Sequence, residues 1–180
     1  MMVSVTVNQF VVPIEDEDLL ADFANLGHEG PDPLDDLAGL RSWWSDLGGS
    51  PTPGRTADLE PLRALRRSLR ALALANNGVP VELDADALDA VPLRLVLAGG
   101  PHLHPIGDTD LIGTVTAAVA SALVRASARP TWPRLKACPG PDCEFVYRDT
   151  TRNGSRRWCV MSQCGNRAKG AAFRARAARD

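Results

Sequence analysis

The chain has 180 residues, of which 44% are hydrophobic and 23% are charged, and its formal net charge at pH 7 is −2. This composition fits a globular protein with an ordinary hydrophobic core. The longest apolar stretch, residues 111–124, contains three hydroxyl residues and is shorter than the ~20 apolar residues that a membrane-spanning helix requires. We therefore expect no membrane segment.

Apolar residues at helical spacing predict a mainly helical amino-terminal part. In the second predicted helix, which Asp32 would cap, Trp43 and Trp44 lie about 100° apart, so we expect one of them to be half-exposed. The segment after Pro92, Leu93-Arg94-Leu95-Val96-Leu97, alternates as a strand does, and a short return strand would form a β-hairpin with it. In chain order, the predicted elements are a β-prone start at 2–12, helices at 17–26, 33–47, 57–76 and 84–90, strands at 92–97 and 102–104, and a helix at 110–128.

The near-neutral total hides two parts of opposite charge. Residues 1–133 carry 9 basic and 18 acidic side chains, whereas residues 134–180 carry 11 basic and 4 acidic ones. Pro130 and Pro133 separate the two parts, which predicts domains at 1–132 and 133–180. A basic tail on an acidic carrier is typical of a module that binds a polyanion. Alternatively, the arginines only neutralise the charge of the cysteines described next.

All four cysteines lie in the basic tail as two C-x4-C pairs, Cys138 with Cys143 and Cys159 with Cys164. Four thiolates from two short turns are a ligand set that Zn²⁺ accepts, so we predict a zinc site made of these four residues. Two disulfides, or free structural cysteines, are the alternatives. The amino terminus has no basic n-region and is interrupted by acidic residues at 15–18, so we expect a cytoplasmic protein with reduced thiols.

Within the tail we predict a tight turn at 138–143, a strand at 145–149, and a hairpin turn at Asn153-Gly154 that returns through 156–158. A helix follows from about Val160 and carries Cys164 near its start. The predicted fold class is therefore α+β. A mainly helical domain with a small β-hairpin precedes a small, treble-clef-like zinc finger made of turn, hairpin and helix.

The tetrapeptide Cys164-Gly165-Asn166-Arg167 resembles the signature of the CGNR zinc-finger family, and the resemblance extends over residues 152–159, Met161 and residues 168–169. Upstream, residues 20–25 and the leucine-rich region after them are similar to the ABATE domain that precedes the finger in this family. The resemblance implies a stress-induced transcription regulator. The family commonly has an aromatic residue followed closely by Asp after the second cysteine, whereas here Arg148 separates Tyr147 from Asp149.

These observations predict a zinc-dependent DNA-binding transcription regulator, whose acidic domain senses a ligand or forms a homodimer. RNA is a related alternative, with Phe145, Tyr147 and Trp158 as stacking candidates or as the core of the finger. The second alternative is a protein-interaction or assembly module that binds no nucleic acid. We expect that the protein is not an enzyme. Four cysteine ligands leave no coordination position of the zinc ion free for water or substrate, and no catalytic motif is evident. The predicted nucleic-acid contacts are Arg148, Arg152, Arg156, Arg157, Arg167, Lys169, Arg174 and Arg176.

Overall fold

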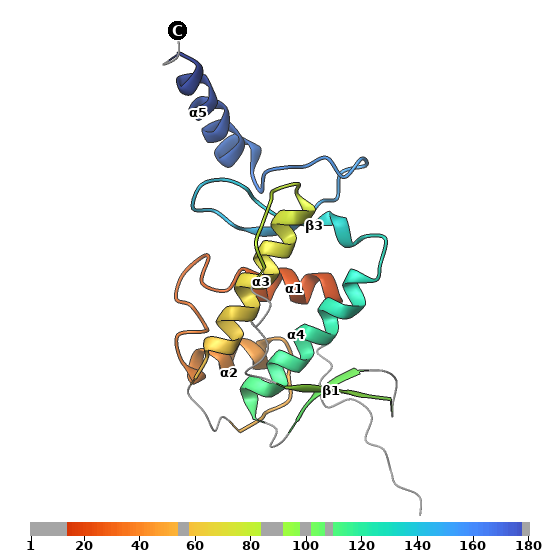
Figure 1. Ribbon diagram of the computed structural model, residues 1–180. Helices are drawn as coiled ribbons and strands as arrows, with labels where there is room; N and C mark the ends of the chain where they lie inside the picture. The colour runs from red at the N-terminus through yellow and green to blue at the C-terminus, as the bar shows by residue number, and fades with distance from the viewer. Residues whose placement is uncertain (1–13, 54–57, 84–91, 98–101, 107–109, 178–180) are drawn as a thin grey trace, which may run out of the picture.

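The computed structural model describes residues 14–53, 58–83, 92–97, 102–106 and 110–177 (Figure 1). The predicted strand at 2–12 and the predicted helix at 84–90 lie outside these ranges. In chain order, the described elements are α1 (Asp16–Ala24), α2 (Leu37–Asp46), α3 (Glu60–Asn76), β1 (Leu93–Val96), β2 (His102–Pro105), α4 (Leu111–Ser127), a 3₁₀ turn (Trp132–Arg134), β3 (Leu135–Ala137), β4 (Val146–Arg148), a π-helical turn (Met161–Gly165) and α5 (Asn166–Ala177).

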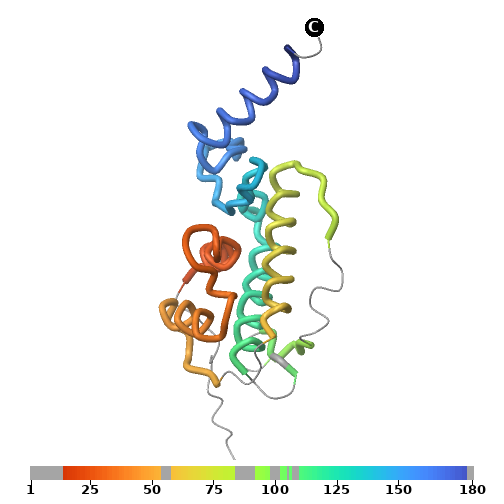
Figure 2. Tube along the Cα trace, turned by 90° about the vertical axis from the view of Figure 1, so that its left-hand side faces the viewer, coloured from red at the N-terminus to blue at the C-terminus, as the bar shows by residue number. Residues whose placement is uncertain are grey.

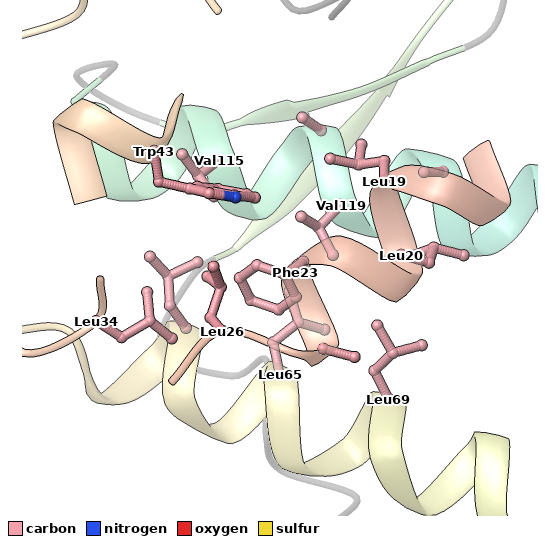
Figure 3. Close-up of a cluster of buried hydrophobic side chains, with 14 of the residues drawn as sticks. Leu19, Leu20, Phe23, Leu26, Leu34, Trp43, Leu65, Leu69, Val115 and Val119 are labelled. Carbon is pink, nitrogen blue, oxygen red and sulfur yellow. The ribbon is translucent and has the colours of Figure 1, made fainter. Parts of the chain in front are cut away.

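Helices α3 and α4 lie side by side and run in the same direction, with α1 and α2 beside them (Figure 2). Phe23 of α1 has no exposed surface and packs among Leu65 of α3 and Val119 of α4 (Figure 3). Leu19 and Leu20 of the helix predicted at 17–26 are buried too, as are Leu62, Leu65 and Leu69 of the helix predicted at 57–76, whereas Leu72 is only partly buried. Most of α4 is buried, and its Thr114 and Thr116 hydroxyls donate to carbonyl oxygens one turn earlier in the same helix. We call the part up to residue 132 the body.

Helix α2 begins later than predicted. Asp36, not Asp32, caps it, and the Asp36 carboxylate accepts a hydrogen bond of 2.7 Å from the Gly39 N–H. The Asp32 carboxylate instead accepts from the Leu34 N–H and from the Arg66 guanidinium at 2.7–2.8 Å. Because Arg66 lies on α3, far away in sequence, this competition for the Asp32 side chain is not visible in the local pattern.

The two tryptophans of α2 are both buried, so the expectation that one is half-exposed was wrong. Trp43 Nε1 donates to the Asp22 carboxylate at 2.6 Å, and Trp44 Nε1 donates to the Ser50 carbonyl at 3.2 Å. The planes of the two rings are tilted by 45° to each other, and their centroids are 6.2 Å apart. Each polar N–H has a partner, which permits burial of both indoles.

The two small sheets lie at opposite ends of the helical layer (Figure 1). At one end β1 and β2 form the predicted antiparallel hairpin, with Leu95 opposite Leu103. At the other end, the finger, which we define as residues 133–177, packs β3 against α3 and β4 against α1. Leu135, Ala137 and Val146 belong to the same buried core as the helices. Among the described residues, no helix has the length and apolar character to cross a membrane.

Candidate metal centre

The first half of the site is the hairpin of β3 and β4, which pair antiparallel with Ala137 opposite Val146. The predicted strand at 145–149 is present. The prediction that it pairs with residues 156–158, across a turn at Asn153-Gly154, is wrong. The main-chain N–H of Arg156 donates to the Asp149 carboxylate at 2.8 Å rather than to a strand. Residues 149–160, which we call the finger loop, therefore form an irregular segment.

The turn between β3 and β4 carries the first cysteine pair. The Cys138 N–H donates to the Phe145 carbonyl at 2.9 Å, and the Cys143 N–H donates to the Gly140 carbonyl at 3.1 Å. Asp142 and Glu144 have positive φ angles of 59° and 48°, which an unstrained L-residue seldom adopts. The turn is thus sharply folded, and both thiols point to the same side as the second pair.

Gly140 gives the turn room beside the second cysteine pair. A Cβ at this position would lie 3.2 Å from Cys164 Cβ and 3.3 Å from Cys164 Sγ. Both distances are tight contacts with a buried residue, so any side chain here would push the two halves of the site apart. The close approach explains why glycine occupies the middle of the turn.

The second cysteine pair lies at the end of the finger loop and in the π-helical turn that leads into α5. All four sulfur atoms lie within 4.8 Å of one another, and all four cysteines are free thiols. The Sγ atoms of Cys143 and Cys159 are 3.5 Å apart, and those of Cys159 and Cys164 are 3.7 Å apart. A tetrahedral ion with bonds of about 2.3 Å to sulfur separates its ligands by about 3.8 Å, so this cysteine cluster fits a four-coordinate metal ion.

The thiols of the cysteine cluster differ in acidity. Burial raises the pKa of Cys159, and the neighbouring thiols raise it further. Burial also raises the pKa of Cys164, but the Arg167 guanidinium and the neighbouring thiols outweigh it and lower this pKa to about 7. Arg167 Nη2 lies 3.1 Å from Cys164 Sγ and donates to it. Arg167 is therefore placed to neutralise part of the charge of the thiolates that hold a metal.

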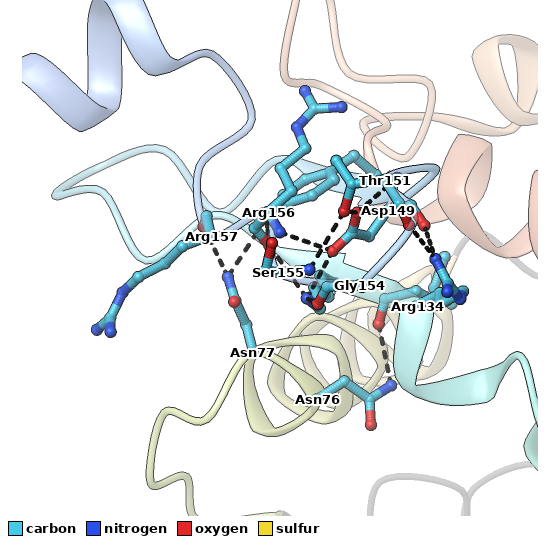
Figure 4. A network of polar contacts seen from close by, with 12 residues as sticks. Asn76, Asn77, Arg134, Asp149, Thr151, Gly154, Ser155, Arg156 and Arg157 are labelled. Atoms are coloured by element: carbon cyan, nitrogen blue, oxygen red, sulfur yellow. Dashed lines mark hydrogen bonds and ion pairs between the residues drawn. The ribbon is translucent and has the colours of Figure 1, made fainter.

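A buried ion pair supports the finger loop. Lys136 Nζ lies 2.8 Å from the Asp149 carboxylate, and the two side chains are 8% and 0% exposed. The same carboxylate accepts from the main-chain N–H groups of Thr151 and Arg156, and Lys136 also donates to the Gly154 and Arg156 carbonyls (Figure 4). These contacts set the path of the loop between β4 and Cys159.

Three asparagines of the body bind main-chain groups of the finger. The Asn25 side chain both accepts from the Val146 N–H and donates to the Val146 carbonyl, each at 2.8 Å. Asn76 donates to the Trp132 and Leu135 carbonyls, and Asn77 donates to the Ala137 and Arg157 carbonyls at 2.8 and 2.7 Å (Figure 4). None of the three was predicted from the sequence to have this role, because their partners lie at distant positions in the chain.

Replacing Asn25 by alanine is expected to lower the free energy of unfolding of the metal-loaded protein by about 2–4 kcal/mol, because two buried main-chain groups of Val146 lose their partners. Urea unfolding followed by circular dichroism measures this loss. Asn166→Ala is the matched control, since its amide makes one exposed bond of 3.2 Å, and we expect a change within about 0.5 kcal/mol. Equal changes in the two variants would contradict a docking role for Asn25.

The predicted basic residues of the finger loop and β4 have different surroundings. Arg152 and Arg157 are exposed, and the Arg157 guanidinium lies 5.7 Å from the Trp158 ring centroid. Arg148 is also exposed but contacts Asp18 of α1 at 3.3 Å. The Arg156 guanidinium lies over the Tyr147 ring at 4.5 Å and donates to the Trp158 and Cys159 carbonyls. Arg156 thus holds the finger together and has few free donors for a ligand.

The remaining predicted basic residues lie on α5, which points away from the body (Figure 2). Lys169, Arg174 and Arg176 are exposed there, and Arg167 at its start contacts Cys164. The aromatic stacking candidates lie around the cysteine cluster instead: Tyr147 is buried, and Phe145 and Trp158 are partly buried against it. The three rings form the small core of the finger.

Two family models match this chain. The model described as "CGNR zinc finger" matches residues 134–177, and the ABATE model, described as "Putative stress-induced transcription regulator", matches residues 17–139. No curated protein matches the chain. The ABATE match covers more than half of the 180 residues. The chain therefore belongs to the ABATE family and carries a CGNR zinc finger that contains the cysteine cluster.

Proposed function

We propose that this protein is a zinc-dependent transcription regulator that binds DNA with its finger. The observation that carries the proposal is the exposed basic surface beside the cysteine cluster. Five of the predicted contacts, Arg152, Arg157, Lys169, Arg174 and Arg176, are exposed, and no acidic residue occurs between Asp149 and Asp180. Arginine and lysine on a rigid frame are the groups that bind phosphate.

Zinc is the metal that this site favours. Four thiolates select soft or borderline metals, and zinc takes four such ligands in a closed tetrahedron that leaves no position for water or substrate. The ion would join the turn after β3 to the start of α5 and neutralise part of the thiolate charge. We therefore propose a structural role for it and no catalysis.

The body would be the regulatory part of the protein. Its net negative charge makes it a poor surface for DNA, so ligand sensing or homodimerisation is the role that we propose for it. Free thiols in the cysteine cluster suit a reducing compartment, and we propose the cytoplasm.

Salt dependence tests the DNA-binding proposal. If the five exposed basic residues neutralise about five phosphates, the affinity of the zinc-loaded protein for random-sequence duplex DNA falls by about 10²–10³ between 50 and 200 mM salt. Fluorescence anisotropy titrations at rising salt measure this slope. Affinity that barely changes with salt, or no retention at all, would refute the proposal.

The Arg157→Ala variant tests the same DNA-binding proposal at a single residue. It should lower affinity at every salt concentration and reduce the slope of log affinity against log salt by about one. Arg41→Ala removes an equal charge from an exposed position on α2, and we expect the slope to stay unchanged. Equal effects of the two variants would show that only net charge, and not the finger, matters.

An interaction module for another protein is the second candidate. Val160, Met161 and Phe173 are exposed apolar side chains on the finger, with 42%, 46% and 67% of their surface accessible. Exposed apolar side chains mark a protein-interaction site when they form one contiguous patch, whereas single ones are ordinary on any protein surface. Capture of a protein by the zinc-loaded chain after nuclease treatment, combined with no affinity for duplex DNA, would favour this candidate.

A further inference from the structure

Helix α5 is held only at its start. Within Asn166–Ala177, all of which the structure describes, no residue is buried, and the helix extends away from the rest of the molecule (Figures 1 and 2). A helix of 12 residues without a buried face gains little from packing and is marginal on its own. A surface that packs against it would therefore come from a partner.

The side chains of α5 are arranged in four rows, as 100° per residue dictates. One face consists of alanine alone: Ala168, Ala171, Ala172 and Ala175. Basic residues lie at about 90–110° on either side of this alanine face, with Arg174 and Arg167 along one edge and Lys169 and Arg176 along the other. Phe173 lies on the opposite face, together with Gly170 and Ala177.

We propose that α5 lies in the major groove of B-form DNA with its alanine face toward the base edges. This inference rests on the proposed function, because it specifies which nucleic acid the finger binds and how. The two basic edges would then contact the phosphates of the two strands, one on each side of the groove.

The dimensions of the helix and of the groove favour this arrangement. The major groove of B-form DNA is about 12 Å wide and admits an α-helix, and α5 is about 18 Å long. Alanine side chains keep the inner face thin, so the helix axis can come close to the bases, and their methyl groups can contact those of thymine. The deep, narrow major groove of A-form RNA does not admit such a helix.

The cysteine cluster fixes the direction of α5. Cys164 lies two residues before the first residue of the helix, and Arg167, in its first turn, donates to the Cys164 sulfur. Metal binding at Cys164 therefore holds the first turn in place, while Lys169, Arg174 and Arg176 extend beyond it. Of the four basic residues of α5, Arg167 then mainly binds the Cys164 sulfur at the metal site.

A pair of alanine-to-leucine substitutions in one helix tests this geometry. The probe is a pool of fluorescent random-sequence duplexes about two helical turns long. Ala171→Leu puts a bulky side chain on the alanine face and is expected to lower affinity about tenfold. Ala177→Leu makes the same chemical change on the opposite face, and its affinity should stay within about twofold of the wild type. Helicity and zinc content are measured for both variants.

Groove-specific competition is the second measurement. Netropsin, which occupies the minor groove, should leave the finger bound, whereas methyl green, which occupies the major groove, should displace it. Equal affinities of the two leucine variants, or displacement by netropsin, would overturn the groove assignment while DNA binding itself stands. If the wild type binds no duplex at all, the proposed function fails, and the groove assignment fails with it.

Discussion

Removal of zinc from the reduced protein is expected to unfold the finger loop and α5 while the body stays folded. Cys138→Ser should have the same effect, because three thiolates no longer close the tetrahedron. In zinc-finger peptides the free energy of metal binding is about 10–16 kcal/mol, and there it is also the free energy of folding. This is the largest effect that we expect from any single change in the chain.

The boundary of the unfolded region follows from the packing. Leu135, Ala137 and Val146 are buried in the core of the body, so β3 and β4 keep their contacts with α3 and α1 without a metal. Beyond β4, the buried side chains of the finger are few: Asp149 and Cys164. A segment of this size has too little apolar surface to fold alone.

Amide hydrogen exchange of the zinc-loaded and the chelated protein measures this boundary. Protection should disappear in residues 149–177 and persist in α1, α3 and α4. Ser162→Ala is the matched control, since this exposed residue lies between Cys159 and Cys164 and no ligand is lost. Unchanged protection of α5 in a chelated, reduced sample would contradict a structural metal.

The parts of the structure that the sequence predicted are those fixed by local patterns. Leucines at helical spacing predicted the buried faces of α1 and α3, and the short spacing within each cysteine pair predicted a common site. The spacing alone left disulfides open, and the separations of 3.5 and 3.7 Å between sulfur atoms now favour a metal over a disulfide bond of about 2.05 Å.

The parts that the sequence did not predict depend on partners far away in the chain. Asn153-Gly154 is a strong hairpin signal, but Lys136 and Asp149 take up the polar groups of this loop, and β4 pairs with β3 instead. Asn25 and Val146 are 121 positions apart, so no local pattern connects them. Arg156 stays a predicted DNA contact, but no local pattern indicates that its guanidinium binds main-chain carbonyls of the finger.

Replacement of Asp149 by asparagine is expected to lower the free energy of unfolding by about 3–5 kcal/mol, because the buried Lys136 ammonium loses its counter-charge. Asp18→Asn is the matched control. It breaks the pair of Asp18 with Arg148, in which both side chains are 48% exposed, and we expect a loss of less than about 1 kcal/mol. Denaturant unfolding of the zinc-loaded proteins measures both changes.

The double variant Lys136→Met/Asp149→Asn separates the ion pair from other effects. With both charges absent, no unpaired ammonium remains, so the double variant should lose less stability than Asp149→Asn alone. A double variant that is as unstable as the two single changes added together would mean that the ion pair itself contributes nothing, and that the loss comes from packing.

The low pKa of Asp149 predicts how the stability difference between wild type and Asp149→Asn depends on pH. Burial raises the pKa of Asp149, but hydrogen bonds from Lys136, Thr151 and Arg156 outweigh it and hold this pKa well below the value of about 3.9 in an unfolded chain. A lowered pKa in the folded state gives stability that is present above the unfolded value and is lost as the pH falls toward the folded one. The difference between wild type and Asp149→Asn should thus stay constant from pH 7 to about 5 and shrink only below about 4. A difference that declines already between pH 7 and 6 would contradict a lowered pKa of Asp149 in the folded protein.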